Sequence, residues 1–88
     1  MTEKKINSLR QKIDHIDQQI CQLIQQRKEI SQEIGNYKKS HRLPIKDIAR
    51  ESKHIESLQK AFHTIDPNLI REVIQKIIDD SVKQQQSN

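Results

Sequence analysis

Two cationic residues lie on a helix face that should be buried, and their spacing suggests a site for a small anion. Arg27 occupies a position at which the helical spacing of apolar residues predicts another apolar side chain. Lys38 follows eleven residues later, which at about 100° per residue returns to nearly the same face, about 16 Å along the axis. A buried cation is costly unless an anion meets it. These two long side chains could hold one small anion between them.

Other polar residues also lie on or beside apolar helix faces. Glu51 falls three residues after Ile48 and four before Ile55, inside an apolar stripe. Each such residue has an ordinary explanation on its own, such as a cation that reaches solvent or a surface ion pair. Together they are harder to explain in that way, because the cations outnumber the one carboxylate. The set is Arg10, Arg27, Lys38, Arg50, Glu51, Ser81 and Gln85.

This set contains no obvious nucleophile and no metal-binding pattern. Cys21 lies outside it, and no histidine stands at helical spacing from Ser81. The histidines are not i, i+4 partners of one another or of the cysteine, so we expect no metal site. Cations and hydrogen-bond donors without a nucleophile favour a reaction in which the substrate is oriented and its developing charge is stabilised.

The segment from Ile6 to Lys38 is predicted to form one long helix. Its apolar residues follow one another in alternating steps of three and four, with Arg27 at one position of this series, and form one continuous seam. About 50 Å of helix is longer than a compact domain of this mass is wide, so we expect a second chain to lie along it. The seam consists of Ile6, Leu9, Ile13, Ile16, Ile20, Leu23, Ile30 and Ile34.

Arg10 can join the same site only from a second chain. It lies seventeen residues before Arg27, about 25 Å away along the same helix. One small ligand cannot touch both residues in one chain. An antiparallel pairing of two long helices would bring Arg10 of one chain to the Arg27–Lys38 region of the other.

Two shorter helices are predicted after the long one, which gives a single all-α domain over residues 1–88. The predicted bounds are about 5–39, 48–63 and 67–85. Asp47 is expected to be the N-cap of the second helix. Asp66, followed by Pro67 at the first helical position, indicates the start of the third. One glycine and 2% aromatic residues exclude an ordinary β-sandwich or barrel.

The net charge of +4 suits an anionic partner. The basic residues are scattered rather than clustered, which argues against binding to nucleic acid or to a membrane surface. No apolar signal core precedes the first helix, and no apolar run approaches membrane length. We therefore expect a soluble cytoplasmic protein.

With these residues in place, the sequence resembles the all-helical, type II chorismate mutases in a monofunctional short form. The similarity covers nearly the whole chain, in order and with its spacing intact. The segments that carry it are Leu9-Arg10 with Ile13-Asp14 and Ile16-Asp17, Gln26-Arg27-Lys28-Glu29-Ile30 with Ile34-Gly35 and Lys38, Pro44-Ile45-Lys46-Asp47 with Arg50-Glu51, and Ile77-Ile78-Asp79-Asp80-Ser81 with Gln85.

The resemblance implies a three-helix protomer in an intertwined homodimer with two equivalent sites. It implies the rearrangement of chorismate to prephenate, a step towards phenylalanine and tyrosine, without any cofactor. Arg27 and Arg10 of the partner subunit would bind the two carboxylates of the substrate. Lys38 and Gln85 would hydrogen-bond its ether oxygen, where negative charge grows as the C–O bond breaks.

The resemblance also assigns the remaining polar residues. Glu51, with the Asp47 backbone, would receive the ring hydroxyl. Ser81 would assist at a carboxylate, and Arg50 would line the site and orient its neighbours. Because Gln85 is a neutral amide that donates at any ordinary pH, we expect activity to persist through neutral and mildly alkaline pH. The short chain predicts no fused catalytic or regulatory domain and hence no intrinsic feedback inhibition.

Two other functions compete with this one. An isochorismate-pyruvate lyase of the same fold would use a similar set of cations, but Asp47, Arg50 and Glu51 favour hydroxyl recognition as in the mutases. In a non-enzymatic helical dimer or nucleic-acid-binding module, Arg27 would only set the register of a coiled coil. Binding to phosphates would then depend strongly on salt.

Overall fold

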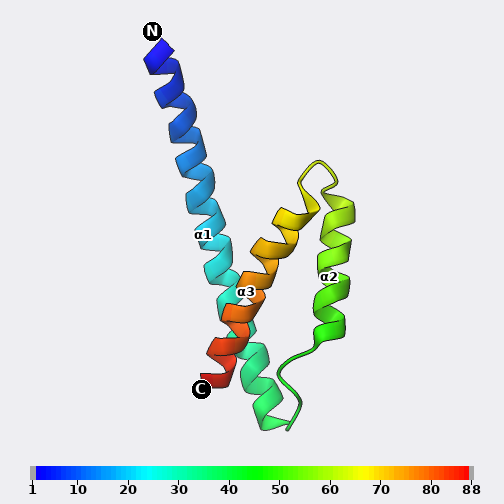
Figure 1. Ribbon diagram of the computed structural model, residues 1–88. Coiled ribbons are helices and arrows are strands. Elements are labelled where there is room, and N and C mark those ends of the chain that lie inside the picture. Colours follow the sequence, from blue (N-terminus) through cyan, green and yellow to red (C-terminus); the bar gives the residue numbers. More distant parts are fainter. Residues whose placement is uncertain (1, 88) are drawn as a thin grey trace.

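The evenly spaced apolar residues of the first segment form one unbroken helix, α1 (Thr2–Ser40), in the computed structural model (Figure 1). The structure describes the backbone of residues 2–87 and the side chains of residues 3–85, so Met1 and Asn88 of the predicted domain lie outside it. Glu3 in the first turn and Lys38 and Lys39 in the last complement the helix dipole.

The other two helices start where the sequence predicts a cap. Before α2 (Ile48–Ala61), the Asp47 side chain accepts a hydrogen bond of 3.1 Å from the Arg50 backbone N–H. Before α3 (Pro67–Ser87), Asp66 Oδ1 accepts one of 3.0 Å from the Asn68 N–H. Both predicted N-caps are confirmed, and so is an all-α chain with one long and two shorter helices.

The helix ends differ by a few residues from the predicted bounds. α2 ends at Ala61 because Phe62 leaves helical geometry at φ −113° and ψ 58°, although its N–H still bonds to the Leu58 carbonyl. α3 continues to Ser87 through a run of glutamines, which are good helix formers. At the other end of the chain, α1 already begins at Thr2.

A tight C-cap turns the chain at the end of α1. Arg42 has a φ of 55°, and the Leu43 N–H bonds to the Lys38 carbonyl at 2.8 Å. The Arg42 N–H bonds to the Lys39 carbonyl at 3.3 Å, so the turn has the hydrogen bonds of a Schellman motif. This cap sends the connecting segment 41–47 back towards Lys38.

Within the described residues, α3 packs against both α1 and α2, whereas α1 and α2 do not pack against each other (Figure 1). The buried apolar side chains among the residues with a described side chain are few: Ile55, Ile70 and Ile78. The molecule is 61 Å long, and its radius of gyration is 17.0 Å. A compact chain of this length would have a radius of gyration of about 12 Å. The protomer therefore has a small core and an extended shape.

The amino-terminal part of α1 extends away from α2 and α3 (Figure 1). Its seam is bare in the protomer, with Ile6 44% and Leu23 62% exposed. Ile48, which belongs to the apolar stripe around Glu51, is exposed as well, and so is Phe62 after the end of α2. Nothing within the described chain covers these apolar side chains. In the described part of the chain, no helix combines the length and the apolar character that crossing a bilayer requires.

Candidate active site

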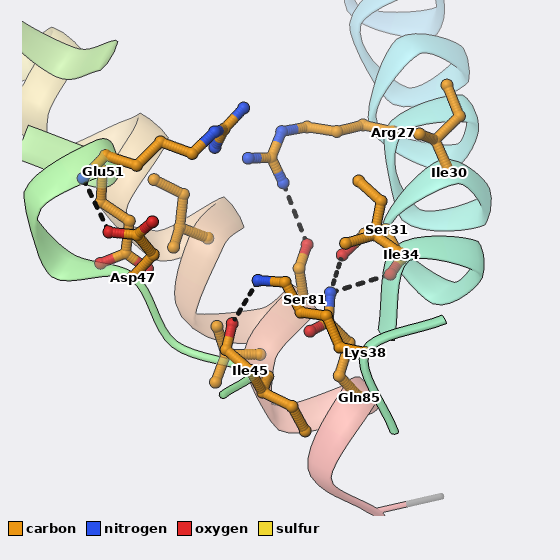
Figure 2. Close-up of a pocket in the computed structure, with 13 residues that line it drawn as sticks. Arg27, Ile30, Ser31, Ile34, Lys38, Ile45, Asp47, Glu51, Ser81 and Gln85 are labelled. Carbon is orange, nitrogen blue, oxygen red and sulfur yellow. Dashed lines mark hydrogen bonds between the residues drawn. The ribbon is translucent and has the colours of Figure 1, made fainter. Parts of the chain in front are cut away.

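The C-terminal half of α1, the segment before α2, the first turn of α2 and the end of α3 enclose a pocket of about 420 Å³ (Figure 2). This volume falls in the range typical of small-molecule sites. Seven of the eight predicted site residues line it: Arg27, Lys38, Asp47, Arg50, Glu51, Ser81 and Gln85. Residues up to 58 positions apart in sequence, from Arg27 to Gln85, therefore meet at one site.

Arg27 reaches across from α1 to α3. Its Nη1 donates a hydrogen bond of 3.0 Å to Ser81 Oγ (Figure 2). The Ser81 hydroxyl donates in turn to the Ile77 carbonyl at 3.0 Å, so its one proton is already engaged. Ser81 is buried and Arg27 half-buried. Ser81 thus holds the guanidinium at the pocket wall and leaves its other N–H groups for a ligand.

Lys38 is tied to the segment that precedes α2. Its Nζ donates a hydrogen bond of 3.0 Å to the Ile45 carbonyl (Figure 2). An ammonium group has three protons, so two remain for a ligand. The Schellman cap after α1 brings Ile45 back to this position, and the local backbone therefore decides where the ammonium lies.

Gln85 joins α3 to α1 by two hydrogen bonds. It is 8% exposed, and its Nε2 donates to the Ser31 carbonyl at 2.8 Å and to Ser31 Oγ at 2.6 Å (Figure 2). Its Oε1 is buried and has no hydrogen-bond partner among the described residues. A buried acceptor without a partner costs free energy. A bound ligand or a change in the orientation of the amide would remove this cost.

The first turn of α2 supplies the acidic side of the pocket. Glu51 is 8% exposed, and its carboxylate makes no hydrogen bond or ion pair with any described residue. The Asp47 carboxylate is occupied by the N-cap bond to the Arg50 N–H. Glu51 is therefore the carboxylate that remains available to accept a proton donor of a ligand.

The lining carries three cations, Arg27, Lys38 and Arg50, against two carboxylates, Asp47 and Glu51. None of these five side chains forms an ion pair with another described residue. The cations keep their charge available, which suits an anionic ligand. The described residues include no group of three or more His, Cys, Asp or Glu side chains that could hold a metal ion.

Arg10 is the one predicted site residue that does not line the pocket. α1 is continuous between it and Arg27, so the two remain about 25 Å apart along the helix. Its side chain is exposed in the protomer.

Comparison with known proteins decides the family. The family model described as chorismate mutase type II matches residues 9–86. The chain belongs to the type II chorismate mutase family. It is 36% identical over 89 residues to the bifunctional chorismate mutase/prephenate dehydratase of Escherichia coli K12, an alignment that covers 98% of this chain and 23% of the relative. It is 30% identical over 78 residues to the chorismate mutase of Methanocaldococcus jannaschii, covering 86% of this chain and 79% of the relative.

This chorismate mutase-family chain thus spans less than a quarter of the length of the bifunctional relative. The Enterobacter agglomerans protein of the same name is 34% identical over 83 residues, which cover 91% of this chain and 21% of that relative.

The pocket also contains residues that the sequence analysis did not predict as site residues. Ser31 is the polar one; it follows Arg27 by four positions and therefore shares its helix face. That spacing is the signal that would have found it. Apolar side chains complete the wall: Ile30, Ile34, Ile45, Ile78 and Val82.

Proposed function

We propose that this chain catalyses the rearrangement of chorismate to prephenate. The observation that carries the proposal is a pocket lined by Arg27, Lys38 and the buried Glu51, which form no ion pair with one another. Chorismate is a compact dianion with a ring hydroxyl and an ether oxygen. The cations match its carboxylates, and the free carboxylate of Glu51 matches its hydroxyl.

The reaction breaks the ether C–O bond while a C–C bond forms within the same molecule, so it needs no nucleophile and no cofactor. Negative charge grows on the ether oxygen in the transition state. Lys38 and Gln85 are the donors proposed to meet that charge, and the second and third protons of the Lys38 ammonium are free to do so. A donor that is stronger for the transition state than for the substrate accelerates the reaction.

The other side chains are proposed to orient the substrate. Arg27, held by Ser81 at 3.0 Å, binds one carboxylate, and Ser81 assists mainly by fixing the guanidinium. Glu51, with the Asp47 backbone, accepts the ring hydroxyl. Arg50 lines the same wall. Holding the substrate in a near-attack conformation supplies part of the rate enhancement.

The second carboxylate is assigned to Arg10 of the partner subunit in an intertwined homodimer. The bare seam of α1 supports this, because Ile13 and Ile16 are more than half exposed in the protomer. Three buried apolar side chains are too few to stabilise a domain of this size alone. A second copy of α1 laid antiparallel along the seam covers it and carries its Arg10 to the open side of the pocket.

The direct test is to incubate the purified chain with chorismate and to follow prephenate by proton NMR. We expect enzyme-dependent conversion without added metal or cofactor. A parallel incubation with isochorismate, assayed for pyruvate, tests the lyase of the same fold. Turnover of isochorismate alone would assign the pocket to that lyase. Turnover of neither substrate, with salt-dependent binding to nucleic acid, would make the chain a non-enzymatic module.

A further inference from the structure

The Gln85 carboxamide uses its NH₂ group on Ser31 and therefore does not offer a donor to a ligand in this orientation. Both hydrogen bonds of Nε2 go to Ser31, at 2.8 Å to the carbonyl and at 2.6 Å to the hydroxyl. A planar amide that directs its NH₂ group at Ser31 turns its oxygen away from it, and Oε1 is the buried atom without a partner. An ether oxygen cannot donate to that acceptor.

The Gln85 side chain lies against α1 at Gly35. A Cβ placed on Gly35 would stand 2.6 Å from Gln85 Cγ and 3.1 Å from its Cδ. The buried Gly35 therefore provides the space in which the Gln85 side chain lies. A turn of the carboxamide about its own terminal bond exchanges Oε1 and Nε2 and leaves the rest of the side chain in place.

The two groups of Ser31 respond differently to such a turn. A backbone carbonyl only accepts, so it favours the orientation in which Nε2 faces it. A serine hydroxyl accepts or donates according to the rotation of its O–H bond. After the turn, the hydroxyl can donate to Oε1, whereas the carbonyl has no proton to offer.

We propose that Ser31 is a positioning residue for Gln85. Its hydroxyl accepts from Nε2 in the orientation described above. When substrate binds, the hydroxyl donates to Oε1 and holds the carboxamide with Nε2 towards the ligand. The growing charge on the ligand oxygen favours this second orientation over the first. The inference rests on the proposed mutase activity, in which Gln85 is a donor.

Steady-state kinetics of the Ser31→Ala variant test whether Ser31 affects catalysis. Without the hydroxyl, only the carbonyl remains, and it favours the orientation that hides the donor. We expect kcat to fall about 3- to 10-fold, the loss of one neutral hydrogen bond, with little change in KM. In a Gln85→Ala background, the same Ser31→Ala change should alter kcat by less than about 2-fold, because the group on which Ser31 acts is absent. An equal loss of kcat in both backgrounds would overturn the proposal.

Ser57→Ala is the matched control. Ser57 is exposed on α2, and its hydroxyl donates to the His54 carbonyl at 2.7 Å, so the variant also loses one helix-surface hydrogen bond. We expect unchanged kcat in this variant. A fall equal to that of Ser31→Ala would mean that the effect of Ser31 is a general loss of helix stability, and the proposal would be wrong.

A measurement that does not depend on turnover separates this proposal from the mutase assignment. In ¹⁵N-labelled protein, the Gln85 side-chain NH₂ signals are identified by their loss in Gln85→Ala. We expect Ser31→Ala to shift these signals and to speed their exchange with water, while Ser57→Ala leaves them unchanged. Unaltered signals in Ser31→Ala would overturn the positioning role even if the enzyme is active. Shifted signals in a chain that does not convert chorismate would support the contact of Ser31 with Gln85 and would refute the proposed mutase activity.

Discussion

At the scale of single residues, the most informative feature is that, among the side chains that the structure describes, as many polar ones as apolar ones are buried. Glu51, Ser81 and Gln85 are each at most 8% exposed, as are three isoleucines. Burying a polar group costs free energy unless it is satisfied. Ser81 is satisfied by Arg27 and Ile77, but among the described residues the buried Oε1 of Gln85 has no hydrogen-bond partner. The chain carries this cost where a ligand is proposed to bind.

Removing either main cation should abolish most of the activity without unfolding the protein. Arg27→Ala and Lys38→Ala should each lower kcat/KM by roughly 100-fold or more, because each removes a charged donor from the pocket. Steady-state kinetics measure this loss, and circular dichroism checks the helix content. Lys39→Ala is the matched control, since Lys39 is exposed in the same turn and does not line the pocket. Wild-type turnover in either pocket variant would refute the assignment.

Gln85→Glu should make the reaction depend on pH. A glutamate donates a hydrogen bond only when protonated, and a site that offers it the Ser31 carbonyl disfavours the carboxylate form. The activity of the variant should therefore fall as pH rises towards neutral, while wild-type activity persists into mildly alkaline pH. Profiles of kcat against pH for both proteins provide the measurement. A wild-type kcat that drops steeply above pH 6 would contradict a neutral amide donor.

At the scale of the elements, the crossing of α3 over α1 decides the position of Gln85. Gly35 is the contact point, and helix interiors normally disfavour glycine. Its presence in α1 is explained by the Gln85 side chain, whose Cγ would lie 2.6 Å from an added Cβ. The Schellman cap after α1 plays a similar part for Lys38, because it returns Ile45 to accept the ammonium.

Gly35→Ala should separate activity from helix stability. Alanine favours the helix by about 1 kcal/mol over glycine, but its methyl group must displace the Gln85 side chain. We expect kcat to fall about 10-fold or more while the free energy of unfolding changes by less than about 1 kcal/mol, since the two effects oppose each other. Chemical denaturation and steady-state kinetics measure the two quantities. Asn36→Ala, at the exposed neighbour of Gly35, should keep full activity. Full activity of Gly35→Ala would show that the close approach is not needed.

At the scale of the whole molecule, the single chain is elongated and leaves apolar surface exposed. It is 61 Å long and 16 Å across its shortest dimension, and no described residue covers one apolar face of α1. Exposed apolar surface of this extent marks an interaction site. In the proposed dimer, the same interface that covers the seam also completes the pocket with Arg10, so folding, association and catalysis depend on one another.

Mixing two inactive variants should restore activity if the site is shared. An Arg10→Ala chain paired with a Lys38→Ala chain forms one site with both changes and one with neither. After unfolding and refolding an equimolar mixture, about one quarter of the wild-type activity should return, because about half of the dimers are mixed. Size-exclusion chromatography with light scattering verifies the dimer. An inactive mixture that contains mixed dimers would contradict the contribution of Arg10 across the interface.

The sequence by itself determined the three helices, two of their N-caps and the shared face of Arg27 and Lys38. These features are local: hydrogen bonds of a helix span four residues, and the 3.6-residue period fixes which side chains share a face. Only the tertiary structure decided that Gln85 lies on Ser31 and that Arg27 bonds to Ser81, contacts between residues 54 positions apart. Such contacts depend on how closely α3 approaches α1, and that distance follows from the missing side chain of Gly35 rather than from any periodic pattern.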